Sequence, residues 1–143
     1  MKIAVMGTGS VGSALGRSFA KAGHVVMFGV RDVRKPPVQK LEAETGACAA
    51  SVKAAAAFGE AAALAIPWGA VPGLLQETNG LHGKIVLDCT NPLNASFSGL
   101  DTGEATSAAE QIAAWAPGAR VVKVFNMTGA GNGVRRAGVG CKT

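Results

Sequence analysis

The most informative segment of the sequence is Gly7-Thr8-Gly9-Ser10-Val11-Gly12, a Gly-x-Gly-x-x-Gly motif close to the start of the chain. Residues 3–6 before it form a short apolar run, Ile-Ala-Val-Met, which is typical of a buried strand. Apolar residues from the motif onward recur at helical spacing on one face: Val11, Leu15, Phe19 and Ala22. A strand, a glycine turn and a helix in this order are the context in which the motif indicates dinucleotide binding.

Each glycine of the motif has its own physical role in that interpretation. Gly7 allows a tight turn, Gly9 leaves no Cβ between the backbone and a pyrophosphate, and Gly12 lets the helix pack close to the strand. The first turn of the helix offers unpaired N–H groups and the positive end of the helix dipole to the phosphates. The alternative is a glycine-rich turn without a ligand. The flanking strand and helix favour dinucleotide binding.

Composition and charge limit the classes of partner. The 143 residues suffice for one domain with a sizeable core, and the hydrophobic fraction of 48% is ordinary for a globular protein. The net charge of +5 is divided among short clusters and tyrosine is absent, so we do not expect a base-stacking nucleic-acid surface. The alanine-rich run at residues 54–66 is too short and too interrupted to cross a membrane.

The cysteines predict the redox environment. Cys48, Cys89 and Cys141 lie far apart and form no Cys-x-x-Cys pair, which argues against a disulfide framework and against a zinc site. Cys48 and Cys89 have apolar neighbours in the sequence, so we expect both to be buried thiols. A reducing, cytoplasmic location is therefore expected.

Strand-like and helix-like segments alternate along residues 1–126. This pattern predicts a nucleotide-binding α/β domain with a doubly wound parallel sheet, the Rossmann fold, in strand order 3-2-1-4-5-6. The predicted strands cover residues 3–6, 24–29, 47–50, 61–66, 84–88 and 120–125. The predicted helices cover residues 11–22, 38–45, 52–58, 70–77 and 108–115.

Residues 61–66 are apolar throughout, so periodicity alone leaves helix and strand open there. Ser107 and Glu110 form a capping-box pattern at the start of the last predicted helix. Residues 127–143 are rich in glycine and basic residues without an apolar period, and we expect a loop or a disordered tail.

The end of the second predicted strand carries the signal for the type of cofactor. An acidic residue at this strand tip accepts the ribose 2′-hydroxyl of NAD, and Asp32 lies at a suitable separation from the glycine motif. The strand begins directly after Gly23, however, which places its tip near Val30 and Arg31 beside it. A guanidinium there suits a 2′-phosphate and Lys35 adds charge, so the sequence favours NADP over NAD. The alternative is that these cations only solvate a loop.

Three further strand ends are expected to meet the glycine motif, because ligands of open parallel sheets bind outside the carboxyl ends of the strands. These ends are Ile66-Pro67-Trp68, Asn91-Pro92 and Asn126. The two asparagine amides suit a nicotinamide or a substrate carbonyl, whereas a proline alone is more often a strand terminator. Neither His24 nor His82 has a catalytic context. We therefore expect no catalytic side chain and assign the chemistry to the cofactor.

Four segments support a more specific interpretation. They are Lys2-Ile-Ala-Val-Met-Gly-Thr-Gly-Ser-Val-Gly12 with the following Ala-Gly-His-Val-Val and Arg31-Asp32, then Leu64-Ala-Ile-Pro-Trp68, Asp88-Cys-Thr-Asn-Pro-Leu93 and Val121-Val-Lys-Val-Phe-Asn126. In this order, and across residues 1–126, they resemble the coenzyme F420-dependent NADP oxidoreductase family. The Asn-Pro-Leu and Val-Lys-Val-Phe-Asn segments are much more specific than the glycine motif.

The resemblance implies an oxidoreductase that transfers a hydride directly between NADPH and a deazaflavin or flavin-like acceptor, without an obligatory acid or base side chain. It implies that residues 8–11 surround the pyrophosphate and that Arg31 and Lys35 hold the 2′-phosphate. It also implies that Pro67, Trp68, Asn91 and Pro92 border the nicotinamide. The full set of predicted cofactor-binding residues is Gly7, Thr8, Gly9, Ser10, Val11, Gly12, Arg31, Lys35, Ile66, Pro67, Trp68, Asn91 and Pro92.

The sequence departs from the family pattern in two places. Val30 stands where the family has a small hydroxyl residue, so one hydrogen bond to the 2′-phosphate is expected to be absent. Family members continue past the Phe-Asn segment with elements that help to form the acceptor pocket and a dimer, and residues 129–143 match none of them.

The alternative function is a non-catalytic dinucleotide-binding module that needs a partner or the missing C-terminal region. The expected partners are a small-molecule electron acceptor and a second copy of the chain in a homodimer, without nucleic acid or membrane.

Overall fold

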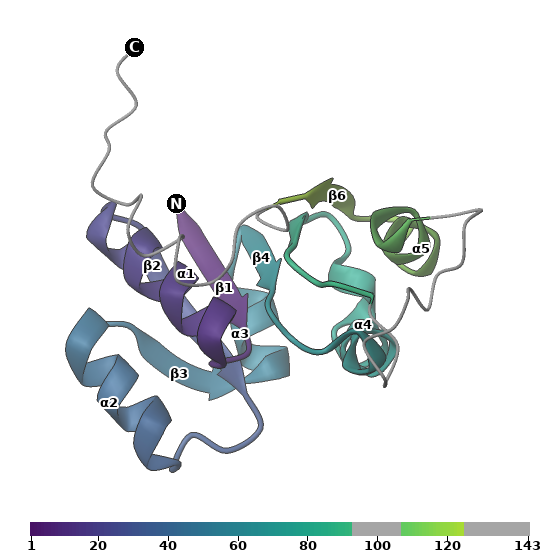
Figure 1. Ribbon diagram of the computed structural model, residues 1–143. Helices are drawn as coiled ribbons and strands as arrows, with labels where there is room; N and C mark the ends of the chain where they lie inside the picture. Colours follow the sequence, from purple (N-terminus) through teal and green to yellow (C-terminus); the bar gives the residue numbers. More distant parts are fainter. Residues whose placement is uncertain (93–106, 125–143) are drawn as a thin grey trace.

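The computed structural model describes residues 1–92 and 107–124, which form one parallel sheet covered by helices (Figure 1). The sheet has six strands in the order β3-β2-β1-β4-β5-β6, and every neighbouring pair is parallel. The predicted fold class and strand order are therefore confirmed. The strands are β1 Lys2–Met6, β2 Val25–Val30, β3 Cys48–Ser51, β4 Ala61–Leu64, β5 Ile85–Asp88 and β6 Arg120–Lys123.

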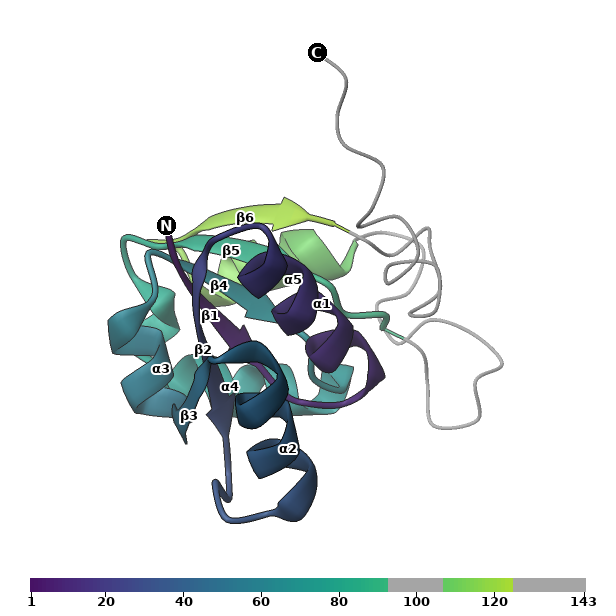
Figure 2. The same ribbon diagram turned by 90° about the vertical axis from the view of Figure 1, so that its left-hand side faces the viewer.

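Helices connect the strands and cover both faces of the sheet (Figure 2). They are α1 Ser10–Lys21, α2 Pro36–Thr45, α3 Val52–Phe58, α4 Val71–Glu77 and α5 Ala108–Trp115, with short 3-10 turns η1 Trp68–Ala70 and η2 Asn79–Leu81. None of these helices is long and apolar enough to cross a lipid bilayer. The tail predicted at residues 127–143 lies outside the described residues.

The core consists of two apolar layers, one on each face of the sheet. Alternate residues of a strand point to opposite faces, so Ile3 and Val5 pack with α1 and α2, whereas Ala4 and Met6 pack with α3, α4 and α5. All four residues of β4 are buried, because helices cover the central strand on both sides. This explains why residues 61–66 show no strand period in the sequence although Ala61–Leu64 form a strand.

The buried face of α1 agrees with the predicted one only in part. Leu15 is buried and Phe19 packs against the core as predicted, whereas Val11 and Ala22 are exposed. The helix also buries Gly12, Ala14 and Gly16. A Cβ on Gly16 would lie 2.2 Å from the ring of Phe28, so the helix approaches the sheet more closely than an apolar side chain would allow. The spacing of apolar residues did not indicate the whole buried face of the helix, because two of the residues on this face are glycines.

The structure refines one further expectation and corrects another. Pro36 and Pro37 were compatible with a loop or a helix N-terminus before the helix predicted at residues 38–45, and the structure has the helix N-terminus: α2 begins at Pro36. A proline in the first helical turn lacks only an N–H that would be unpaired there anyway. Cys48 is exposed rather than buried, since it lies on β3 at the edge of the sheet. The predicted capping box of α5 is confirmed at Ser107 and Glu110. Ser51 caps α3 by accepting a hydrogen bond from the backbone N–H of Ala54.

Candidate functional site

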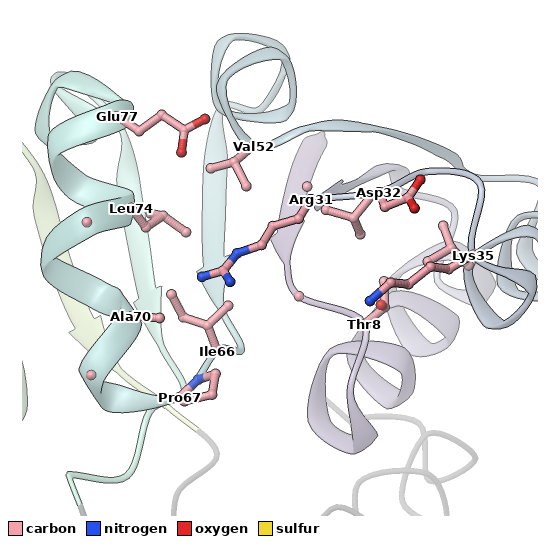
Figure 3. Close-up of a pocket in the computed structure, with 16 residues that line it drawn as sticks. Thr8, Arg31, Asp32, Lys35, Val52, Ile66, Pro67, Ala70, Leu74 and Glu77 are labelled. Carbon is pink, nitrogen blue, oxygen red and sulfur yellow. The ribbon is translucent and has the colours of Figure 1, made fainter.

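A cavity of about 650 Å³ lies at the carboxyl ends of β1, β2 and β4 (Figure 3). This is the edge at which open parallel sheets bind their ligands, at the point where the strand order reverses. The cavity is lined by Gly7, Thr8, Gly29, Val30, Arg31, Asp32, Lys35, Val38, Val52, Ile66, Pro67, Gly69, Ala70, Gly73, Leu74 and Glu77.

The glycine turn after β1 is fixed by close backbone packing. Gly7 has a φ of +99°, a conformation that favours glycine, and its N–H donates to the carbonyl of Gly29 at 3.1 Å. A Cβ on Gly7 would lie 2.4 Å from the carbonyl oxygen of Ala65. A Cβ on Gly12 would lie 2.1 Å from the carbonyl oxygen of Gly7. These two glycines are therefore required by the packing of the chain itself.

Gly9 differs, because a Cβ at this position would meet no other atom of the described chain within 4 Å. Its φ of −70° is also open to any residue. Gly9 is the N-cap of α1 and provides no side-chain cap, so the N–H groups of the first turn face outward without a side-chain acceptor. The turn thus has the form that a pyrophosphate requires: open space above Gly9 and free donors at a helix N-terminus.

Two basic side chains extend from the end of β2 into the cavity. In Figure 3 the guanidinium of Arg31 reaches across toward Ile66 and α4, and the ammonium of Lys35 points toward Thr8. Both residues are exposed, and neither forms an ion pair within residues 1–92 and 107–124. Because β2 ends at Val30, Arg31 is the first residue after the strand, as predicted.

Asp32, the residue that could mark an NAD site, is engaged by its own loop. Its Oδ1 accepts hydrogen bonds from the backbone N–H of Arg34 at 3.0 Å and from the Nε of Arg34 at 3.3 Å. A carboxylate used to close a turn is less available to a ribose hydroxyl. The electrostatics of the β2 tip are therefore set by the unpaired cations of Arg31 and Lys35.

The predicted residues at the tips of the other strands are distributed over more than one environment. Ile66 and Pro67 line the cavity, together with Gly7, Thr8, Arg31 and Lys35. Trp68 lies against Trp115 of α5, with 5.4 Å between ring centroids and an interplanar angle of 33°. Asn91 is exposed and Pro92 is buried after the end of β5, and neither lines the cavity. Asn126 lies outside the described residues.

A buried ionic network at the ends of β5 and β6 was not predicted. Asp88 is fully buried, and its Oδ1 accepts from the N–H of Thr90 at 2.9 Å and from the Oγ1 of Thr90 at 2.6 Å. Lys123 donates from Nζ to Oδ2 of Asp88 at 3.0 Å and also to the carbonyl of Thr90. The network fixes the turn that presents Asn91. In the sequence, the network is indicated only by Asp88 and Lys123, an acidic and a basic residue at the ends of two apolar strand segments.

Cys89 lies next to this network but is not a nucleophile. Burial and the nearby charge of Asp88 together raise the pKa of its thiol to about 12, although the charge of Lys123 opposes this rise. The thiol therefore stays protonated near neutral pH, and thiolates rather than thiols are the reactive species. No histidine lines the cavity, and the described residues contain no group of three or more metal-ligating side chains.

A sheet of this order with this glycine turn at its switch point defines a Rossmann domain of the dinucleotide-binding class. Residues 2–92 match the model of the family described as NADP oxidoreductase, coenzyme F420-dependent. The match covers more than half of the chain, and the chain therefore belongs to this family. A search of curated protein sequences gave no match.

Solved structures agree with the family assignment. A candidate F420-dependent NADP-reductase from Arthrobacter sp. FB24 is 33% identical with a TM-score of 0.84, over 92% of this chain and 65% of that one. A hypothetical protein from Sinorhizobium meliloti is 26% identical with a TM-score of 0.81, over 94% of this chain and 65% of that one. A reductive aminase from Aspergillus terreus, solved in complex with NADPH and ethyl levulinate, is 25% identical with a TM-score of 0.66, over 85% and 39%. The chain thus spans 65% of the length of the first two proteins.

Proposed function

We propose that the chain binds NADP(H) in the cavity and supplies it as hydride donor or acceptor to a deazaflavin or flavin-like partner molecule. The observation that carries the proposal is the pair of cations at the tip of β2. Arg31 and Lys35 extend into the cavity without an acidic partner among the described residues, whereas Asp32 is bound by Arg34. A 2′-phosphate is the group of a dinucleotide that would satisfy them.

Gly7 and Thr8 line the cavity, whereas Gly9, Ser10, Val11 and Gly12 follow them in the chain outside its lining. We place the pyrophosphate over Gly9 and the first turn of α1, beside the cavity, because this is an open helix N-terminus. Ser13 steadies this loop by donating from Oγ to the carbonyl of Thr8 at 2.8 Å. The nicotinamide extends past Ile66 and Pro67 toward the turn held by Asp88. When bound, NADPH supplies the hydride itself. The protein positions the ring and excludes water, which is consistent with a cavity without acid or base side chains at that end.

Arg31→Ala tests the 2′-phosphate contact. We expect the variant to lose about tenfold or more in affinity for NADPH, because one charge-assisted contact is removed, and to lose much less affinity for NADH, which has no 2′-phosphate. Both affinities are measured by calorimetric titration at one salt concentration. The matched control is Arg120→Ala, which removes an exposed arginine outside the cavity. An equal loss for both cofactors, or no loss, contradicts the proposed contact.

The acceptor is tested separately. Hydride transfer from NADPH is followed by loss of absorbance at its nicotinamide band, with deazaflavin, free flavin and ferric compounds offered in turn. Reduction of a deazaflavin or flavin supports the reductase. The second candidate is a dinucleotide-binding module without activity of its own. NADPH binding without turnover on any acceptor would support this second candidate.

A further inference from the structure

The part of the cavity farthest from the glycine turn is formed by one face of α4 and its preceding turn. Ala70, Gly73, Leu74 and Glu77 line it, and their spacing of three, four and seven residues places them on the same side of a helix. Val52, the first residue of α3, lines the cavity as well. Figure 3 shows the guanidinium of Arg31 directed toward this wall from the end of β2.

The wall has the shape and polarity that a planar ring requires. A Cβ on Gly73 would meet no atom within 4 Å, so the glycine leaves open space where another residue would project into the cavity. Ala70 and Leu74 provide an apolar surface beside it. A guanidinium plane such as that of Arg31 stacks well on an aromatic ring. The wall and Arg31 can therefore hold a purine base between them.

Glu77 is the polar group at the far end of this wall. It is the last residue of α4, it lines the cavity, and Figure 3 shows its carboxylate on the same side of the cavity as Leu74. Glu77 forms no hydrogen bond or ion pair with the described residues, whereas the other lining carboxylate, Asp32, is engaged by Arg34. The side chain is exposed at the edge of the cavity. An ionised carboxylate only accepts hydrogen bonds, so a ligand that contacts it directly must offer a donor there.

We propose that Glu77 selects an adenine base over a 6-oxopurine base in the bound dinucleotide. The inference rests on the proposed NADP(H) site and adds the residue that reads the base. Adenine presents an exocyclic amino group, a donor, at the position where hypoxanthine and guanine present a carbonyl, an acceptor. The Glu77 carboxylate accepts a hydrogen bond from the amino group of adenine. When the base is a 6-oxopurine, the carboxylate faces the carbonyl oxygen of the base, which is also an acceptor, and no hydrogen bond forms. Discrimination then has two sources: the hydrogen bond gained with adenine and the two acceptors left facing each other with a 6-oxopurine.

The test compares NADPH with its deaminated analogue, in which hypoxanthine replaces adenine. The wild-type protein is expected to bind NADPH about tenfold more tightly than the analogue, the value of one hydrogen bond to a charged group. In Glu77→Gln the ratio is expected to fall to about one, because the side-chain amide accepts from an amino group or donates to a carbonyl equally well. In Glu77→Leu the ratio is also expected to fall, through weaker binding of NADPH.

The ratio of the two affinities is the measured quantity, because removal of a negative charge near the phosphates changes both affinities in the same direction. Glu44→Gln is the matched control, since Glu44 is paired with Arg17 outside the cavity, and it should keep the wild-type ratio. Equal wild-type affinities, or a ratio that persists in Glu77→Gln, overturns this inference alone. Failure of NADPH itself to bind overturns the proposed function and the inference together.

Discussion

At the scale of single residues, the glycine motif contains two different kinds of glycine. Gly7 and Gly12 are needed because backbone oxygens lie within 2.4 Å and 2.1 Å of the place where their Cβ atoms would be. Gly9 has no such neighbour within 4 Å. The packing of the described chain therefore requires the first and third glycines of the motif but not the second. The proposed function gives the second glycine a role, because a bound pyrophosphate would approach the backbone there.

This difference can be tested by two alanine variants. Gly12→Ala is expected to lower the free energy of unfolding by about 1–3 kcal/mol, because the new methyl group overlaps a backbone oxygen that cannot move independently. Gly9→Ala is expected to change it by less than about 1 kcal/mol and to weaken NADPH binding instead. Denaturant unfolding and calorimetric titration measure the two effects. Wild-type NADPH affinity in Gly9→Ala would show that no ligand approaches this position.

The cysteines give a second prediction at this scale. Burial raises the pKa of Cys89 to about 12 from its ordinary value of 9.0, so its thiol stays neutral between pH 7 and 9 and carries almost no reactive thiolate. Cys48 is exposed on β3. In a Cys141→Ser background we expect iodoacetamide to alkylate Cys48 rapidly at pH 8 and Cys89 slowly, as measured by peptide mass spectrometry. Equal rates at the two positions would contradict the burial of Cys89.

At the scale of elements, the parallel strands were predicted from the alternation of apolar runs and helical segments. The last helix was placed by the capping box at Ser107, which marks a helix start by local hydrogen bonds alone. The glycine part of the buried face of α1 could not be predicted in the same way, although Leu15 and Phe19 could. Its contacts are made by Gly12 and Gly16, which carry no apolar signal and act through the close approach of two backbones.

The Asp88–Lys123 pair joins the ends of β5 and β6 and is also an effect of tertiary structure. Asp88 is fully buried and Lys123 is 26% exposed, so loss of either partner leaves a charge that is poorly solvated. Both Asp88→Asn and Lys123→Met are expected to lower the free energy of unfolding by about 3 kcal/mol. The double variant should cost clearly less than the sum of the two, because it leaves no unpaired charge.

Chemical denaturation of the four proteins, the wild type, the two single variants and the double variant, measures this coupling. Thr90→Ser serves as the control, since it retains the hydroxyl that donates to Asp88 and removes only a methyl group. Additive losses in the double variant would mean that Asp88 and Lys123 act independently. In that case the pair would not be the feature that fixes the turn at Asn91.

At the scale of the whole molecule, the sequence was sufficient to predict the fold and the part of the candidate site formed by the ends of β1 and β2. The glycine turn and Arg31 are predictable because both follow a strand directly, and a parallel sheet brings successive strand ends to one edge. Glu77 was not predictable, because it reaches the cavity through the direction of α4 and no local pattern encodes that direction. The same applies to Trp68, which packs on Trp115 from a helix distant in the sequence.

The central claim is that the cavity at this edge is built for a dinucleotide with a 2′-phosphate. Titration of the wild-type chain with NADPH and NADH under one set of conditions tests it most directly. We expect NADPH to bind at least about tenfold more tightly, because the cations of Arg31 and Lys35 meet the additional phosphate. Equal affinities, or tighter binding of NADH, would contradict the account.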